Sequence, residues 1–79
     1  MRITVKLYAT LRRYGPEPPA GAGFELEVPA EADVETAVEC LGIPDGVALV
    51  AMVNNEAVRL DHVLVAGDVL SLFPPVAGG

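Results

Sequence analysis

The sequence predicts a two-layer α+β domain, in which a sheet of about five strands packs against one main helix. Three observations support this fold class. Apolar and polar residues alternate near both ends of the chain, one central segment has helical spacing, and residues rich in Gly, Pro or Asn separate these segments. The 79 residues suit one domain, residues 1–79, with a small core.

The first part of the chain predicts two strands joined by a long hairpin loop. In residues 2–8 (RITVKLY), every second side chain is apolar, as in a strand with one buried face. Residues 9–15 are short enough for a single helical turn, and residues 15–23 (GPEPPAGAG) have the composition of a loop. Residues 24–28 (FELEV) alternate again and predict the second strand.

The main helix is predicted within residues 32–44 (ADVETAVECLGIP). Asp33 is a good N-cap because its carboxylate accepts a backbone N–H bond, while Gly42 suits the left-handed position after the last turn and Pro44 prevents continuation. The residues that share the apolar face are Val34, Ala37, Val38 and Leu41. Glu35 and Glu39 are expected on the solvent side.

Three further strands are predicted after the helix. Residues 48–53 (ALVAMV) contain an apolar strand of about five residues, which reaches a turn at Asn54-Asn55. Residues 58–60 (VRL) are interpreted as a short return strand, and residues 69–73 (VLSLF) as the last strand. Two strands, a helix and three more strands are consistent with a ubiquitin-like β-grasp arrangement.

Composition excludes several classes of function. The net charge of −6 argues against nucleic acid as a partner, because phosphates attract clustered Lys and Arg. The acidity either favours a basic protein surface or serves only to keep a small apolar protein soluble. No apolar run is long enough to span a membrane, and no signal peptide is recognisable, so we expect a cytoplasmic protein. The single cysteine permits no internal disulfide, and no Cys–His cluster suggests a metal site.

The segment FPPVAGG, residues 73–79, is predicted to be a flexible functional tail. Two prolines end the last strand and project the backbone outward in an extended conformation. Glycine has no Cβ, so the final residues fit a narrow channel in another protein. The tail residues expected to enter such a channel are Pro74, Pro75, Val76, Ala77 and Gly78. Phe73 is assigned to the core or to partner contact.

The chemistry is predicted at the carboxylate of Gly79. A carboxylate is a poor electrophile, but adenylation by ATP gives it AMP as a leaving group, and a sulfur nucleophile then leaves a thiocarboxylate. The protein itself would bind no cofactor, because ATP is used by the activating partner. It would be a carrier that is not catalytic by itself.

The sequence resembles the sulfur-carrier proteins of the MoaD/ThiS family over nearly the whole chain, most closely the molybdopterin synthase branch. The segments that carry the likeness are VKLYATLRRYG, DVETAVECL, MVNNE and LVAGDVLSLFPPVAGG. The resemblance implies a β-grasp fold with a mixed sheet. It also implies a role in molybdenum cofactor biosynthesis, in which the Gly79 thiocarboxylate supplies sulfur for the dithiolene of molybdopterin.

The same resemblance implies three partners: an E1-like adenylating enzyme of the MoeB type, the large subunit of molybdopterin synthase of the MoaE type, and a sulfur donor protein. The alternatives are a carrier for thiamin thiazole or tungsten cofactor synthesis, or a ubiquitin-like protein modifier joined to lysines through Gly79. Cys40 is interpreted as a small apolar helix residue rather than a relay sulfur, and His62 as a surface residue.

Overall fold

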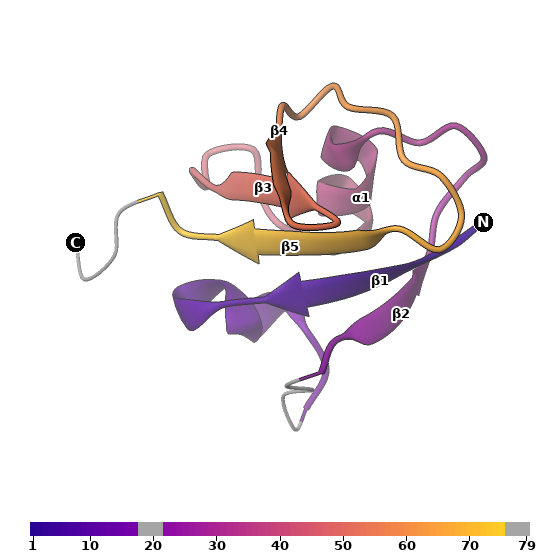
Figure 1. Cartoon of the computed structure of the whole chain (residues 1–79). Helices are drawn as coiled ribbons and strands as arrows, with labels where there is room; N and C mark the ends of the chain where they lie inside the picture. Colours follow the sequence, from indigo (N-terminus) through magenta and orange to yellow (C-terminus); the bar gives the residue numbers. More distant parts are fainter. Residues whose placement is uncertain (18–21, 76–79) are drawn as a thin grey trace.

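The computed structural model describes residues 1–17 and 22–75. Its elements, in chain order, are β1 (Arg2–Leu7), the 3-10 helix η1 (Ala9–Tyr14), β2 (Phe24–Glu27), α1 (Val34–Cys40), β3 (Val50–Val53), β4 (Glu56–Val58) and β5 (Val69–Phe73). The strands form one sheet in the order β2-β1-β5-β3-β4 (Figure 1). The predicted α+β class and the number of strands are therefore confirmed.

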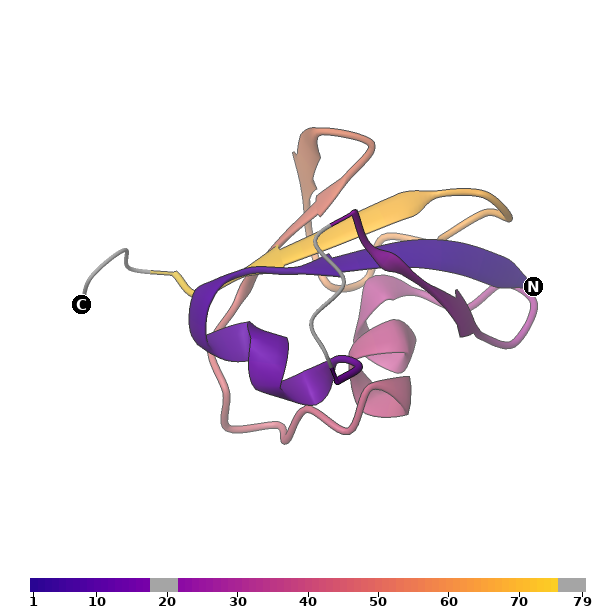
Figure 2. The ribbon, with the colours of Figure 1, turned by 90° about the horizontal axis from the view of Figure 1, so that it is seen from below.

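The sheet is mixed, and β5 lies at its centre. β1 pairs with β2 in antiparallel and with β5 in parallel orientation, whereas β3 is antiparallel to both β5 and β4. Figure 2 shows η1 and α1 on the same side of the sheet. Helices thus cover one face of the sheet, and within residues 1–17 and 22–75 no helix covers the other face, which we call the open face. This is the β-grasp arrangement predicted from the sequence.

The core lies between α1 and the covered face of the sheet. Alternation along the strands selects its members, since successive side chains point to opposite faces. The most buried large side chains are Ile3, Val5, Val34, Leu64, Leu70 and Leu72. Leu70 and Leu72 alternate with half-buried Ser71, so β5 has the predicted inward and outward faces.

Helix α1 begins and ends where the sequence predicts. The Asp33 carboxylate accepts the backbone N–H of Thr36 at 2.9 Å and the Thr36 hydroxyl at 2.7 Å. These two bonds lower the pKa of Asp33 because they stabilise its ionised form. Past the last turn, Gly42 has a φ of +80°, the left-handed conformation that glycine adopts without strain.

Two predictions need correction. The return strand is Glu56–Val58 rather than residues 58–60. Asn54 and Asn55 have φ values of +50° and +71°, so they form a tight two-residue connection and pairing resumes at once. The helical segment after β1 is also longer than the single turn predicted, since η1 spans six residues of 3-10 helix. It buries Leu11 in the core.

Candidate functional site

The candidate functional site is the carboxyl end of β5, where the predicted tail leaves the sheet. β5 is paired along both edges, with Leu72 opposite Leu7 on β1 and Phe73 opposite Val50 on β3. The backbone N–H of Tyr8 also donates to the carbonyl of Leu72 at 3.1 Å. Figure 1 shows this strand end and the N-terminus at opposite ends of the sheet. The starting point of the tail is therefore held from two sides.

An aromatic pair marks this strand end. The rings of Tyr8 and Phe73 stack with centroids 4.4 Å apart and planes inclined by 10°. Tyr8 follows the end of β1 and Phe73 ends β5, so parallel pairing of the two strands brings the rings together. Both residues are half-buried. A stacked pair contributes about 0.5–1.5 kcal/mol beyond the area it buries, so it stabilises the point of exit.

The open face of the sheet is apolar beside the aromatic pair. Val50, opposite Phe73, is 41% exposed, and the next outward positions on β3 and β5 are Met52 and Ser71, which pair with one another. We call Tyr8, Phe73, Val50 and Met52 the exit patch. A partly exposed apolar patch at the base of the tail has the character of a surface for protein contact.

The far edge of the same open face is charged. The guanidinium of Arg2 lies 3.1 Å from Glu27 and 3.4 Å from Glu25, across the β1–β2 pair. The hydrogen bond from Arg2 is the main reason that the pKa of Glu27 is lowered. The charges of Glu25 and Glu27 are thus partly balanced within the chain by Arg2.

The structure places the predicted site residues as follows. Phe73 ends β5, Pro74 is half-buried next to it, and Pro75 is exposed. The predicted roles of the remaining tail residues fall on positions outside the described residues, namely Val76, Ala77, Gly78 and Gly79. Their assignment to a partner channel and to the chemistry therefore stays a prediction.

The residues assigned to no chemistry lie on the surface. Cys40, the last residue of α1, is exposed. His62 is exposed in the turn after β4. Within residues 1–17 and 22–75, no three potential metal ligands cluster. In the same two stretches, no helix has the length and apolar character of a membrane span.

Two features were missed from the sequence. The first is Tyr8, whose place on the open face follows from extending the alternation of β1 by one residue. The second is a buried carboxylate, Asp68, which is 6% exposed. The Asp68 carboxylate accepts hydrogen bonds from the side-chain amide of Asn54 at 3.0 Å and from the backbone N–H of Val65 at 2.9 Å. The side-chain carbonyl of Asn54 in turn accepts the backbone N–H of Val69 at 2.9 Å.

These features define a class of protein. It is a ubiquitin-like β-grasp domain of the sulfur-carrier type, in which a central strand leads into the C-terminal segment beside an open apolar face. The ThiS family matches residues 5–79, so the chain belongs to the ThiS family. None of the curated proteins matches the sequence.

Solved structures agree with the fold. The crystal structure of SAMP1 from Haloferax volcanii has a TM-score of 0.74 and 28% identity, with 100% of both chains covered. A putative molybdopterin converting factor, subunit 1, from Pyrococcus furiosus has a TM-score of 0.71 and 27% identity, covering 95% of this chain and 98% of that chain.

A third similar structure contains a partner. It is the complex of subunits 1 and 2 of the molybdopterin-converting factor from Helicobacter pylori, with a TM-score of 0.62 and 25% identity over 100% of both chains. The predicted family and fold are therefore confirmed.

Proposed function

We propose that this protein is a sulfur carrier whose Gly79 carboxylate is converted to a thiocarboxylate and then used by a molybdopterin synthase. The observation that carries the proposal is the geometry of the strand end. A central strand, fixed along both edges, ends in Phe73 and passes directly into Pro74-Pro75 beside the exit patch. This arrangement suits a tail that enters another protein while that protein binds the folded domain.

The proposed chemistry has two steps. In the first, a carboxylate oxygen of Gly79 attacks the α-phosphorus of ATP on an E1-like enzyme, forming an acyl-adenylate and releasing pyrophosphate. In the second, sulfide sulfur, supplied through a donor protein, attacks the acyl carbon and AMP leaves with the bonding electrons. The product is a thiocarboxylate, and the carrier itself holds no cofactor.

The proposed destination is the large subunit of molybdopterin synthase, where the sulfur completes the dithiolene of molybdopterin. The Helicobacter pylori complex supports this choice, because there a chain with the same fold is bound to a subunit 2. Gly78 would let the tail pass through a narrow channel, and the exit patch would contact the walls around it. Carriers for thiamin thiazole or tungsten cofactor synthesis would use the same chemistry with a different acceptor.

The test is the intact mass of the protein after incubation with ATP, an E1-like enzyme and sulfide. We expect a gain equal to the replacement of one oxygen by sulfur, localised to the C-terminal peptide. A chain lacking Gly79 should show no gain at an unchanged melting temperature, because an exposed terminal residue adds little to the core. An unmodified full-length chain, in a mixture that converts a known carrier, would refute the proposal.

A second candidate function is protein modification, which is favoured by the similarity to SAMP1 and to the small archaeal modifier protein 1 of Haloferax volcanii. The activated Gly79 would then react with a lysine amine to give an amide. Lysine-linked conjugates in a cell extract, together with no transfer of sulfur to a pterin precursor, would favour this function over the first.

A further inference from the structure

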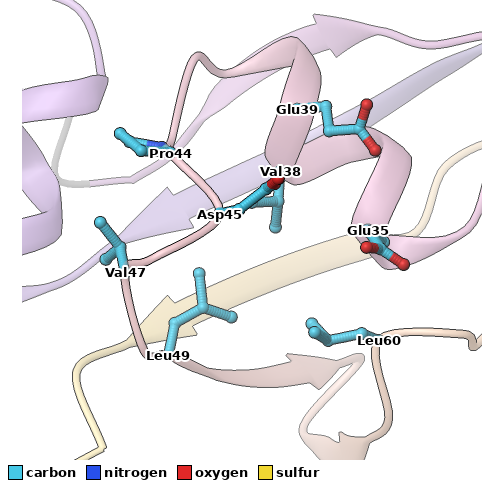
Figure 3. Close-up of a pocket in the computed structure, with 8 residues that line it drawn as sticks. All are labelled: Glu35, Val38, Glu39, Pro44, Asp45, Val47, Leu49 and Leu60. Atoms are coloured by element: carbon cyan, nitrogen blue, oxygen red, sulfur yellow. The ribbon is translucent and has the colours of Figure 1, made fainter.

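A small groove lies between α1 and the segment that follows it (Figure 3). Its apolar lining comes from three parts of the fold: Val38 on α1, Val47 and Leu49 before β3, and Leu60 after β4. Leu60 is 45% exposed. We call this cavity the α1 groove, and it lies on the helix side of the molecule, away from the open face of the sheet.

Backbone hydrogen bonds fix the wall at the end of α1. The N–H of Gly42 donates to the carbonyl of Glu39 at 2.9 Å, and the N–H of Ile43 donates to the carbonyl of Val38 at 3.3 Å. This pair of bonds is the Schellman motif, which ends a helix and turns the chain back. The buried side chain of Ile43 anchors the turn in the core.

The other two walls are fixed in the same way. The N–H of Val47 donates to the carbonyl of Pro44 at 3.1 Å, which closes a turn in the segment opposite α1. The N–H of Glu35 donates to the carbonyl of Leu60 at 2.9 Å, so Leu60 is tied to the first turn of the helix. Backbone hydrogen bonds therefore hold the three segments that bound the α1 groove.

The rim of the α1 groove is acidic. Glu35 and Glu39 lie one turn apart on α1, and Asp45 lies on the opposite segment (Figure 3). In the part of the chain that the structure describes, none of the three is in an ion pair. The sequence has no Lys, Arg or His from Val34 to Leu49, and Arg59, next to Leu60, pairs instead with Asp61.

This charge pattern is unfavourable in the isolated chain. Like charges four residues apart on a helix repel one another, and Glu39 lies near the C-terminal end of α1, where the helix dipole disfavours an anion. A cation supplied from outside would relieve both effects. The α1 groove is thus complementary in charge to a positive side chain.

The size and lining of the α1 groove suit the guanidinium end of an arginine. Its volume of about 60 Å³ is that of about four water molecules, taking roughly 15 Å³ for each. The methylene stem of arginine can lie on Val38 and Leu49, while its fork of N–H donors reaches carboxylates on both walls. Arginine is also more weakly hydrated than lysine, so it loses less on entering a half-apolar site.

We propose that the α1 groove binds an arginine side chain on the surface of a protein partner. The methylenes contact Val38, Leu49 and Leu60, and the guanidinium pairs with the carboxylates on the rim. The site does not depend on the chemistry of Gly79.

The test uses methyl NMR spectra of the full chain during titration with acetyl-Gly-Arg-Gly-amide. We expect saturable shifts of the methyl signals of Val38, Leu49 and Leu60. The matched control peptide replaces arginine by citrulline, which has the same shape without the charge, and its Kd should be at least tenfold higher. Equal affinities, or shifts located elsewhere, would overturn the proposal.

Two variants that each lose one negative charge distinguish binding in the α1 groove from attraction to the net negative charge of the protein. Glu39→Gln should raise the Kd of the arginine peptide at least threefold, whereas Glu56→Gln, an exposed glutamate on β4, should leave it unchanged. Equal effects would mean that the peptide senses only net charge, and the proposal would fail. The dispersed methyl signals report in the same spectra that each variant is folded.

The outcome is independent of the proposed function. A chain lacking Gly78 and Gly79 cannot carry sulfur, yet it should bind the arginine peptide with the Kd of the full chain. A chain that binds the peptide without acquiring a thiocarboxylate would refute the carrier function alone. A chain that is thiocarboxylated but binds no arginine would refute the groove alone.

Discussion

Substitution of Asn54 by alanine tests how the start of β5 is held. The Asn54 side chain accepts the N–H of Val69 and donates to the Asp68 carboxylate, so it links the end of β3 to the first residue of β5 and to the residue before it. Asn54 also has a φ of +50°, which alanine adopts only with strain. The substitution therefore removes two hydrogen bonds and adds a backbone cost.

The magnitude follows from these two parts. Strain in the left-handed region costs roughly 1 kcal/mol for a residue with a Cβ. Asn54 is exposed, so water replaces part of what is lost, and the two hydrogen bonds together contribute about 1–2 kcal/mol. We expect a loss of about 2–3 kcal/mol in the free energy of unfolding. A domain of this length has roughly 4–12 kcal/mol in total, so the loss is substantial.

Asn55→Ala is the matched control. Asn55 has a φ of +71°, and among the described residues its side chain forms no hydrogen bond. It should therefore cost only the strain, roughly 1 kcal/mol. Urea unfolding followed by circular dichroism measures both variants. If Asn54→Ala were no more destabilising than Asn55→Ala, the hydrogen bonds of Asn54 would contribute nothing and the reasoning would be wrong.

Three further predictions concern the strand end, acid stability and self-conjugation. Phe73→Ala and Tyr8→Ala should each destabilise the domain, and a double-mutant cycle should give a coupling of about 1 kcal/mol from urea unfolding; independent effects would exclude a contribution from stacking. The pKa of Asp33 is lowered in the folded state, so ionised Asp33 contributes to the free energy of unfolding above its ordinary pKa of 3.8, and this contribution is lost as the pH falls through the lower folded pKa. Asp33→Ala should therefore reduce the fall of the urea midpoint with decreasing pH. An unchanged fall in the variant would contradict the role of Asp33. Lys6 is the sole lysine of the sequence, so Lys6→Arg should abolish amide-linked dimers formed through Gly79; dimers that persist, shown by peptide mass spectrometry to involve another amine, would contradict this.

The sequence predicts the strands, the helix and its caps because their signals are local. Asp33 and Gly42 each act on backbone groups within a few residues, and the alternation of Leu70, Ser71 and Leu72 is visible without any knowledge of pairing. The return strand was misplaced because the short segment after Asn55 has weak alternation. Its register depends on the positive φ values of the turn, which a residue type permits but does not require.

The site was only partly predictable. Pro74 and Pro75 show that the chain leaves the sheet after Phe73, because proline cannot donate to a ladder. The sequence does not show that Tyr8 lies beside Phe73, since that contact depends on parallel pairing between the first and last strands. No local sequence pattern predicts the α1 groove, because its walls come from α1, the loop before β3 and the turn that contains Leu60.

The two ends of β5 differ in the contacts that their side chains form. At its amino end, Asp68 is buried and bonded within the chain, so substitutions there act on folding. At its carboxyl end, Phe73 is half-buried and stacks on Tyr8, and Val50 opposite it on β3 leaves apolar surface uncovered, so substitutions there change both stability and the surface that the domain exposes. Sheet pairing holds β5 along its whole length, so the point at which the chain leaves the sheet after Phe73 is fixed.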